Sequence, residues 1–522
     1  MIARCLALLA LLLVAAPASA QPPDRAEVEG TMRRATSFMV EHVATEGGYV
    51  WSYLPDMSRR WGEAEATPDM IWIQPPGTAT MGQIFLDAFH ATGDDYYYRA
   101  AERVGEALVR GQHRSGGWQY FIDFGGPGAT RRWYETIGRN AWRMEEFHYP
   151  ADDATFDDAG TVEAGIFLLR LYLERNDPRW RPALDKAIRF VLDSQLDMGG
   201  WPQRWPADPA QPAYARLITF NDDVATENIR FLLLAYRTLG GEPLRAAILR
   251  GMEAFLVTQG AAPQAGWGLQ HSLDLKPAGA RTYEPLALTT HTTAANVRQL
   301  LGFYRLTGDA RFLARIPEAL DWLESVRLPA DPARNGRDFP TFIEIGTNRA
   351  IYVHRRGSNV VNGQYYWDYN PEAPIGHYGA YRAIDVPALR RDYDRLHATR
   401  PEDMRAQSPL FAPTPDPLPR FFVSHVDVGS DLNASRAADA AEAVRTLNAD
   451  GWWPTLLRAT SNPYSGPGPA QPVPGDYRTT HVGDASDTSP HPTDHPVTGI
   501  STATYIANMA LLIHALAGEG SE

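Results

Sequence analysis

Residues 186–201 read KAIRFVLDSQLDMGGW, and residues 223–234 read DVATENIRFLLL. The first stretch has apolar side chains at helical spacing and then turns at two glycines followed by a tryptophan. A glycine after a helix supplies the left-handed residue that satisfies the last carbonyls, and the aromatic ring then packs back on the helix. The second stretch places a threonine before a continuous aliphatic run, as at the start of a buried helix. Together the two stretches predict a helical hairpin.

The same hairpin recurs along the chain, and this repetition decides the fold class. The glycine–aromatic turn returns at Gly47-Gly48-Tyr49, Gly116-Gly117-Trp118, Gly266-Trp267 and Gly451-Trp452. The threonine-led second helix returns near Thr78, Thr161, Thr290 and Thr502. We expect the threonine and nearby aspartate oxygens to accept hydrogen bonds from the first-turn amides. Repeated hairpins curl into rings, so the sequence predicts a mainly α fold, an incomplete α/α toroid of helical hairpins with a small β-containing insertion. The N-termini of the second helices should meet at one end of the ring, where a ligand would bind.

Three segments are expected after the leader. Residues 21–328 carry the toroid repeats and most of the candidate site. Residues 329–433 interrupt the repeat with an irregular, β-containing segment, in which Phe342–Val353 predicts a hairpin turning at Gly346-Thr347-Asn348. Residues 434–522 return to a C-terminal helical repeat with a long loop.

The leader itself, residues 1–20, is typical of a secretory signal peptide. Arg4 precedes an apolar run, and Ala18-Ser19-Ala20 forms a small-residue cleavage site. The run is shorter than the roughly 20 residues that cross a bilayer. The single cysteine, Cys5, would leave with the leader, so the mature protein would hold neither a disulfide nor a thiolate metal site. We expect a periplasmic or secreted protein, cleaved near Ala20, with no membrane anchor.

The charge of the chain limits its partners. A formal net charge of −13 argues against nucleic acid as a general partner, because phosphates require a basic surface. An anionic substrate would need clustered arginines or a bound cation to overcome the average field. The composition, with 44% hydrophobic residues in 522, is that of a globular protein with a large core. We expect a monomer.

Five motifs carry the densest chemical information. In chain order they are Thr155-Phe156-Asp157-Asp158-Ala159-Gly160-Thr161, Gly199-Gly200-Trp201-Pro202-Gln203, Ile218-Thr219-Phe220-Asn221-Asp222-Asp223, Ala280-Arg281-Thr282-Tyr283-Glu284-Pro285 and Ile343-Glu344-Ile345-Gly346-Thr347-Asn348-Arg349-Ala350-Ile351. Their order resembles that of the pectic acid lyases, polysaccharide lyase family 10. The resemblance implies an exported lyase that cleaves pectate (polygalacturonate), or a related uronate polymer, by calcium-assisted β-elimination.

The residue types in these motifs suit that chemistry. β-Elimination removes the C5 proton of a uronate, and the neighbouring carboxylate makes that proton hard to take unless its charge is neutralised. Asp157, Asp222 and Asp223 are candidate Ca²⁺ ligands, because Ca²⁺ prefers hard oxygen donors. An arginine is normally always charged. The resemblance nonetheless implies that Arg281 is the catalytic base.

Five further residues are candidate substrate contacts. By resemblance, Arg355 binds a substrate carboxylate, where its planar fork gives bidentate recognition. Asp158, Glu284 and Arg349 lie within the motifs, and Trp205 lies outside the repeated unit, where its ring could serve as a sugar platform.

The chain also departs from the family pattern. Thr341 stands where the family has an arginine, Thr282 is inserted beside Arg281, and residues 288–293 differ from the family segment. These changes bear on polygalacturonate specificity and on lyase activity itself. They leave the sugar, the linkage and endo or exo action open.

Other readings of the same residues remain open. A glycoside hydrolase on the same ring would use Asp158 with Asp222 or Asp223 as acid and base, with no metal. A non-catalytic carbohydrate-binding homologue would keep the groove without the chemistry. The aspartates could also compensate helix dipoles or cap helices, and Arg281 could merely pair with Glu284.

Overall fold

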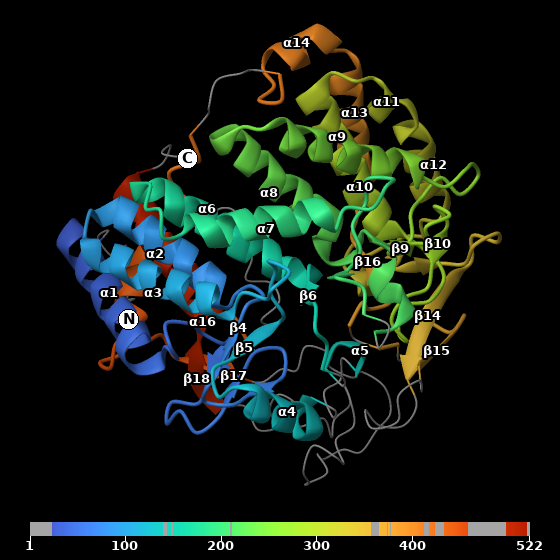
Figure 1. Ribbon diagram of the computed structural model, residues 1–522. Coiled ribbons are helices and arrows are strands. Elements are labelled where there is room, and N and C mark those ends of the chain that lie inside the picture. The colour runs from blue at the N-terminus through green and yellow to red at the C-terminus, as the bar shows by residue number, and fades with distance from the viewer. Residues whose placement is uncertain are drawn as a thin grey trace, which may run out of the picture.

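The computed structural model describes residues 23–138, 144–147, 150–208, 211–355, 365–372, 374–375, 377–411, 417–422, 433–457 and 497–518. The predicted signal peptide and the proline-rich loop at 465–496 lie outside these residues. The helices form an arc across the molecule (Figure 1). The predicted mainly α, toroid-type fold is confirmed.

Five helices form the inner side of the arc. In spatial order they are α16 (Thr502–Ala517), α2 (Thr78–Thr92), α6 (Gly160–Arg175), α8 (Val224–Leu239) and α10 (Thr290–Thr307). The first four contact one another in that order, and α10 joins the arc through an outer helix, α9 (Glu242–Val257). Helices α16 and α10 lie at opposite ends of the arc, so the toroid is incomplete (Figure 1). The C-terminal helix therefore packs beside the first hairpin of the chain.

Each inner helix is covered on its outer side by a helix of its own hairpin or a neighbour. The remaining outer helices are α1 (Arg25–Phe38), α3 (Asp95–Gly111), α7 (Arg181–Asp193), α12 (Ile316–Ser325), α13 (Val386–His397) and α15 (Ala440–Thr446). Their contacts are to α16 for α1 and α15, to α2 for α3, to α6 for α7 and to α10 for α12 and α13. The apolar faces predicted from the periodicity form the main core between these layers.

The glycine–aromatic turns join the two helices of each hairpin as predicted. The indole nitrogen of Trp118 donates to the carbonyl of Leu108, and that of Trp201 to the carbonyl of Val191, each at 2.9 Å. Gly199 has φ +99°, and a Cβ there would lie 1.8 Å from the carbonyl oxygen of Arg250 in the next outer helix. Glycine is required for this close approach as well as for the turn.

The threonines at the start of the inner helices do not cap first-turn amides as predicted. No side-chain cap bond forms at the start of α2, α6, α8 or α10. Instead, the hydroxyls of Thr78, Thr161 and Thr293 accept hydrogen bonds from the amides of Tyr49, Trp118 and Trp267, at 2.9 to 3.0 Å. These amides belong to the glycine–aromatic turns, where no helical partner is available. The threonine therefore ties α2, α6 and α10 to their own turns.

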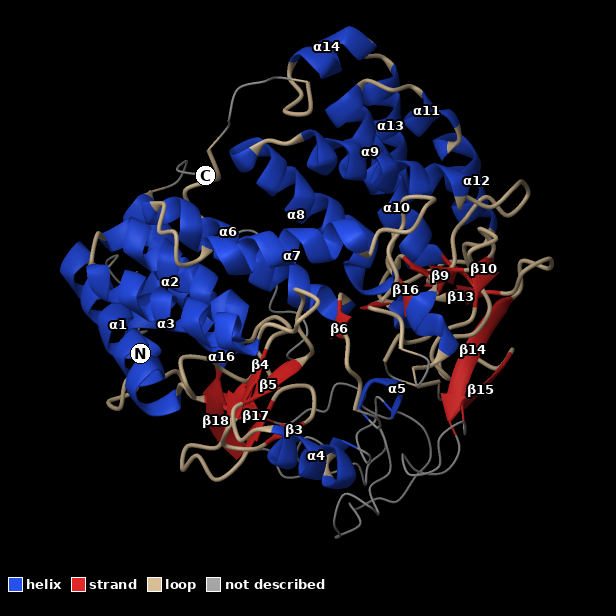
Figure 2. Cartoon of the chain, in the orientation of Figure 1, coloured by secondary structure: helices blue, strands red, loops and turns tan. Residues whose placement is uncertain are grey.

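A short strand leads into every inner helix. These strands are β18 (Val497–Ser501), β4 (Met70–Trp72), β6 (Ala154–Thr155), β8 (Ile218–Thr219) and β11 (Leu288–Thr289). In Figure 2, β4, β6 and β18 lie below the helices, on one side of the arc. The N-termini of α2, α6 and α16 therefore gather at one end, as predicted.

The predicted hairpin in the interruption is confirmed. Strand β13 (Phe342–Ile343) pairs antiparallel with β14 (Ala350–Arg355), and β14 pairs with β15 (Tyr365–Asp368). Strand β11 joins β13 on the other side, which attaches this sheet to the start of α10. A second, small core of Leu269, Tyr283, Ala287, Phe342, Ile351, Val353 and Ile375 lies against it.

The other described elements are short connections. They are η1 (Met39–Val43), β1 (Ser52–Tyr53), β2 (Arg60–Trp61), β3 (Glu65–Ala66), β5 (Phe121–Asp123), α4 (Pro127–Thr136), α5 (Met144–Phe147), β7 (Arg204–Trp205), η4 (Ala213–Arg216), β9 (Gln270–His271), β10 (Pro277–Ala278), α11 (Arg311–Ala314), η6 (Pro332–Arg334), β12 (Phe339–Pro340), β16 (Tyr381–Arg382), α14 (Pro401–Ala406) and β17 (Thr455–Leu457). Among the described residues, we find no helix with the length and hydropathy of a membrane span.

Candidate active site

Two strained turns bring the candidate residues together at the helix starts. The first elbow is η3 (Asp157–Ala159) before α6, and the second is η5 (Asn221–Asp223) before α8. In each elbow two successive residues that are not glycine lie in the left-handed region, with φ between +45° and +59°. Such residues cost about 1–3 kcal/mol each and persist where the surroundings hold them. The strain therefore marks both elbows as functional candidates.

The elbows also correct the register of the repeat. When the repeats are aligned on Thr161 and Thr226, as the sequence suggests, Asp158 corresponds to Asp223. In the structure Asp158 corresponds to Asp222, since each lies two residues before the first residue of its helix. Thr161, which guided the sequence register, corresponds to Ala225, whereas Thr226 lies one position further along. An alignment of the repeats on their threonines is therefore wrong by one residue.

Three carboxylates converge between the elbows. Oxygen atoms of Asp157, Asp158 and Asp222 all lie within 4.8 Å of one another. Tyr120 Oη donates to Asp157 Oδ2 at 2.7 Å, and Gln74 Nε2 donates to Asp158 Oδ2 at 3.0 Å. The residues at the N-cap positions of α6 and α8 are Ala159 and Asp223, and neither makes a side-chain cap bond. The three converging aspartates are therefore not at the N-cap positions of these two helices.

The third carboxylate is electrostatically frustrated. Burial raises the pKa of Asp222 well above its usual range, and the nearby charge of Asp157 raises it further, while Arg281 opposes both. Two neighbouring buried carboxylates cannot both ionise cheaply without a cation or a shared proton. The triad therefore favours a positively charged group next to its carboxylates.

Arg281 supplies part of that charge from a fully buried position. Its guanidinium forms ion pairs with Asp157 at 3.1 Å, with Asp222 at 3.0 Å and with Glu284 at 2.8 Å, and it also pairs with Glu146. Burial alone would lower the pKa of Arg281, but the surrounding carboxylates raise it well above its usual value. In this arrangement Arg281 is a charged hub that joins both elbows.

Further residues complete the cluster, among them Glu146 and Tyr378, which the sequence did not single out. Glu146 comes from the short helix α5, and its carboxylate also accepts a hydrogen bond from Tyr214 Oη at 3.2 Å. Asn221 Nδ2 donates to Glu284 at 3.0 Å and to Tyr378 Oη at 2.8 Å. Tyr378 in turn donates to Glu284. Asn221 belonged to a quoted motif and could have been found there, whereas Glu146 has no periodic or motif signal.

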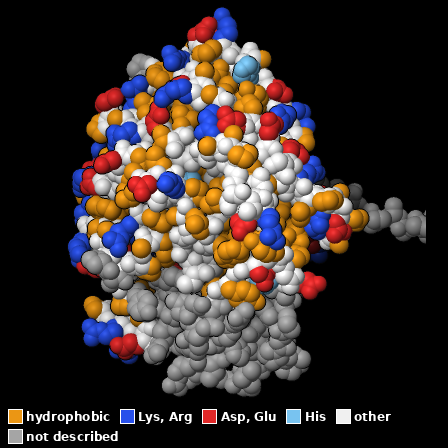
Figure 3. Space-filling model, turned by 90° about the vertical axis from the view of Figure 1, so that its right-hand side faces the viewer, with side chains coloured by type: hydrophobic (Ala, Val, Ile, Leu, Met, Phe, Trp, Pro, Cys, Tyr) orange, Lys and Arg blue, Asp and Glu red, His pale blue; other side chains and the backbone are white. Residues whose placement is uncertain are grey.

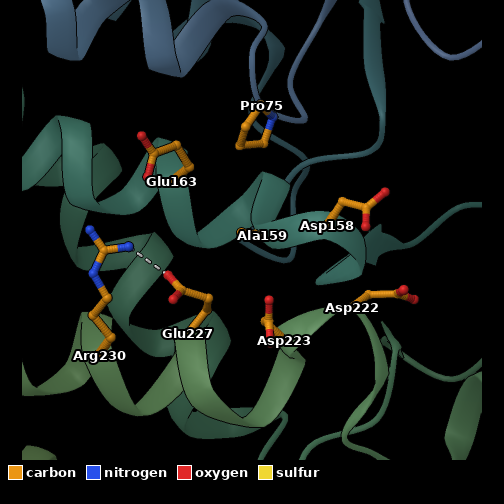
Figure 4. Close-up of a pocket in the computed structure, with 8 residues that line it drawn as sticks. All are labelled: Pro75, Asp158, Ala159, Glu163, Asp222, Asp223, Glu227 and Arg230. Carbon is orange, nitrogen blue, oxygen red and sulfur yellow. Dashed lines mark hydrogen bonds and ion pairs between the residues drawn. The ribbon is translucent and has the colours of Figure 1, made fainter. Parts of the chain in front are cut away.

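An open acidic pocket adjoins the triad between α6 and α8. Its cavity volume is about 120 Å³, and Figure 4 shows the residues that line it: Pro75, Asp158, Ala159, Glu163, Asp222, Asp223, Glu227 and Arg230. Glu227 pairs with Arg230 at 2.7 Å. Asp223 is exposed and faces this pocket, outside the converging triad. A ligand could reach Asp158 and Asp222 from here.

The triad offers suitable donors for a divalent cation. Ca²⁺ takes carboxylate oxygens at about 2.3–2.6 Å, so two ligands on opposite sides of one ion lie at most about 5 Å apart. The spread of 4.8 Å among the three carboxylates fits this limit. Asp157, Asp158 and Asp222 are therefore the residues that could hold a metal ion.

A comparison with known protein families identifies the family to which this region is related. A family model described as "Pectic acid lyase" matches residues 128–365. Residues 128–365 belong to the pectic acid lyase family. The match identifies residues 128–365 as part of a polysaccharide-processing enzyme. All members of the ion-paired cluster lie in the pectic acid lyase segment, namely Glu146, Asp157, Asp158, Asp222, Arg281 and Glu284.

Several solved structures are similar to the chain at low identity. A variant of the family 10 polysaccharide lyase from Cellvibrio cellulosa, in complex with trigalacturonic acid, has 18% identity and a TM-score of 0.37 over 56% of this chain and 89% of that chain. The α-1,6-mannanase GH76A of Salegentibacter sp. HEL1_6 has 12% identity and a TM-score of 0.35 over 94% and 98%. An unsaturated glucuronyl hydrolase specific for heparin has 10% identity and a TM-score of 0.39 over 94% and 96%. No curated protein matches the chain.

The other predicted substrate contacts are Trp205, Arg349 and Arg355. Two of them lie apart from the cluster, and the third has a side chain that the structure does not describe. Trp205 is half-buried on β7 and packs edge to face on Phe190. Arg349 is exposed at the β13–β14 turn and stacks on Tyr369. The side chain of Arg355 lies outside the described residues.

Thr341, which replaces a family arginine, is buried. Its hydroxyl donates to the carbonyl of Gly379 at 2.8 Å, and its amide donates to the carbonyl of Ala380 at 3.0 Å. These bonds join the start of the β13–β14 hairpin to the segment that carries Tyr378. In this pectic acid lyase segment, position 341 therefore has a structural role.

Proposed function

We propose that the chain is an exported lyase that cleaves polygalacturonate, or a related uronate polymer, by β-elimination between the two elbows. The observation that carries the proposal is the partly buried Asp157–Asp158–Asp222 triad, in which Asp157 and Asp222 form ion pairs with Arg281 inside the pectic acid lyase segment. Export and a monomeric state remain predictions from the sequence.

The reaction needs a neutralised carboxylate next to the proton that leaves. When bound at the triad, Ca²⁺ would neutralise the uronate carboxylate and so acidify the C5 proton. Asp157, Asp158 and Asp222 would hold it, in place of the sequence-based set that included Asp223. The exposed carboxylate of Asp223 would then face substrate in the pocket.

Arg281 is the proposed proton acceptor. As a charged hub it cannot accept a proton, so the free guanidine must form during the catalytic cycle. Two of its four carboxylate partners, Asp157 and Asp222, are also members of the triad. When Asp157 and Asp222 bind other ligands, only Glu146 and Glu284 remain to raise the pKa of Arg281. The sharing of partners thus gives Arg281 a physical route to a lower pKa.

Substrate contacts are proposed at residues around and beyond the cluster. Arg355 would bind a uronate carboxylate, Arg349 would bind another carboxylate of the polymer away from the cluster, and Glu284 would hold Arg281 in place through its bond at 2.8 Å. Trp205 would contribute a half-buried ring beside β6.

The test is the ultraviolet absorbance of the unsaturated uronate product. Purified protein with polygalacturonate and Ca²⁺ should show a rising absorbance that chelator stops and that Arg281→Ala abolishes. Arg281→Lys keeps the charge and tests whether the guanidine itself is needed. If the chelated protein, or Arg281→Ala, retains full activity, the mechanism is wrong.

A glycoside hydrolase is the second candidate, favoured by the raised pKa of Asp222. A carboxyl group held protonated at neutral pH can act as a general acid. Oxygen atoms within 4.8 Å of one another suit a retaining pair of carboxylates better than an inverting pair, which stands about 6.5–9.5 Å apart. Reducing ends released without ultraviolet absorbance would establish hydrolysis. Polymer binding without either signal would favour the non-catalytic alternative.

A further inference from the structure

The β14–β15 hairpin carries an exposed aromatic surface that neither the cluster nor the toroid core uses. Trp367 is 45% exposed and Tyr369 is 41% exposed. Their rings lie edge to face, with centroids 6.1 Å apart. Figure 3 faces the side of the molecule on which β14 and β15 lie and shows hydrophobic side chains gathered there beside charged ones. We call Trp367, Tyr369 and Arg349 the hairpin platform.

The platform is held in place although it is exposed. Tyr369 Oη donates to Glu344 Oε1 at 2.9 Å, and the guanidinium carbon of Arg349 lies 3.4 Å from the centroid of the Tyr369 ring. On the other face of the strand pair, His354 Nε2 lies 3.0 Å from Asp368 Oδ1. Side chains that are ordered before binding lose less conformational entropy when a ligand arrives.

The platform lies on the face of the β14–β15 strand pair that also packs against the loop of Arg281 and Glu284. Trp367 is the cross-strand partner of Val353, so both side chains are on one face of the pair. Val353 belongs to the small core with Tyr283, whose ring contacts Tyr365 at a centroid distance of 5.5 Å. Tyr283 immediately precedes Glu284, the partner of Arg281. The exposed platform therefore lies at the edge of a sheet face whose buried part packs against the loop that carries Arg281 and Glu284.

The chemistry of the platform suits a sugar chain that carries carboxylates. The C–H groups of a pyranose ring pack well on an aromatic face, which is the negative part of the ring quadrupole. A guanidinium beside that ring can bind a carboxylate through two parallel hydrogen bonds. A uronate polymer presents both features in every residue, whereas a protein partner would need a larger apolar surface.

We propose that the hairpin platform is a second binding site, which holds an acidic polysaccharide chain outside the cleavage cleft. The proposal rests on the proposed function to the extent that the same polymer occupies both sites. Its effect is to keep long chains near the cluster after a cut.

Affinity electrophoresis of the mature protein tests the platform without cleavage. The probe is polygalacturonate in the gel with chelator present, and hydroxyethylcellulose is the neutral comparison. Trp367→Ala and Arg349→Ala should each weaken retardation by polygalacturonate about tenfold, a change of the size that aromatic and ion-pair contacts produce. The matched control is Phe411→Ala, because Phe411 is 44% exposed and has Arg245 5.2 Å from its ring centroid.

Each outcome decides the proposal. Retardation that is equal in Trp367→Ala, Phe411→Ala and the parent overturns it, as does a parent that polygalacturonate does not retard. A dimer that Trp367→Ala dissociates would assign the surface to a second copy of the chain and also overturn it. If the platform variants lose binding while the parent produces no unsaturated uronate, the platform stands and the lyase function fails.

Discussion

The two elbows share a backbone conformation and present different side chains. At the first of three positions, Asp157 in one elbow corresponds to Asn221 in the other, and at the third position Ala159 corresponds to Asp223. Only the middle position keeps its chemistry, as Asp158 and Asp222. One elbow thus gives two carboxylates to the triad, and the other gives one together with an amide that binds Glu284.

This difference shows how a repeat can supply an asymmetric site. The repeated backbone aims two equivalent carboxylates at the same point, and the substitutions around them decide which other groups they meet. Tyr120 and Arg281 contact the first position of the first elbow, while Glu284 and Tyr378 contact that of the second. Substitutions in the two elbows should therefore have unequal effects, except at the middle position that both elbows share.

The largest expected effect is on the hub that both elbows share. Arg281→Ala leaves the buried carboxylates without their cation and should lower the free energy of unfolding by about 3–5 kcal/mol. Arg281→Lys keeps one charge but loses the planar fork, so its loss should be smaller. Urea unfolding with chelator measures both variants. An Arg281→Ala protein that unfolds at the parent's urea midpoint would show that the carboxylates are protonated instead.

The second elbow should also be the more sensitive to acid. Phe220, at its start, packs on His271 with centroids 5.5 Å apart, whereas Phe156 in the first elbow packs on Phe190. Burial lowers the pKa of His271 to about 4 from its ordinary 6.5. Because the unfolded chain binds this proton more readily, stability should fall by about 2–3 kcal/mol as the pH drops from 6.5 to 4.

Urea midpoints across that pH range test the prediction. His271→Gln removes the titrating group and should flatten the slope between pH 6.5 and 4. The control is His397→Gln on the outer helix α13. If the parent and His271→Gln show the same slope, other groups cause the acid sensitivity.

The middle positions should matter about equally to catalysis. Asp158→Asn and Asp222→Asn each remove one candidate metal ligand, so each should lower lyase activity by about a hundredfold or more and weaken Ca²⁺ binding. Activity titrated against Ca²⁺ separates the two losses, since excess Ca²⁺ restores only an affinity defect. A full-activity Asp158→Asn protein would place the metal elsewhere.

The smallest effect is expected at the third position. Asp223→Ala makes the second elbow match the first, where Ala159 stands. If Asp157, Asp158 and Asp222 are the metal ligands, the variant should keep its Ca²⁺ affinity within about threefold, because a residue outside the coordination shell acts only through its charge. A loss as large as that of Asp222→Asn would restore Asp223 to the ligand set.

The sequence predicted the ring because its signals are local. Apolar periodicity, the turn at Gly199 and the tryptophan after it all act within one hairpin, and the structure confirms them. The Arg281–Glu284 pair, considered as a purely structural alternative, also forms. Local signals sufficed for these features because each joins residues that are close in the sequence.

The features that the sequence missed depend on distant contacts or strained backbone. Glu146 reaches Arg281 across 135 residues from a four-residue helix, which leaves no periodic pattern. The left-handed conformation of Asp222 also has no sequence signal, because aspartate adopts it only when the surrounding structure requires it. The one-residue error in the alignment of the two elbows arose because the sequence does not reveal this left-handed turn.

The place of α16 beside α1 and α2 has a consequence for how the chain acquires its structure. Thr36 and Tyr505 share a buried hydrogen bond of 2.6 Å across 469 positions of sequence. The first hairpin therefore lacks one wall until nearly the whole chain has been made, which at about 5–20 residues per second takes on the order of a minute. Contacts of such long separation slow folding. The N-terminal hairpin should be the last part of the ring to become protected from hydrogen exchange, although it is the first to be synthesised.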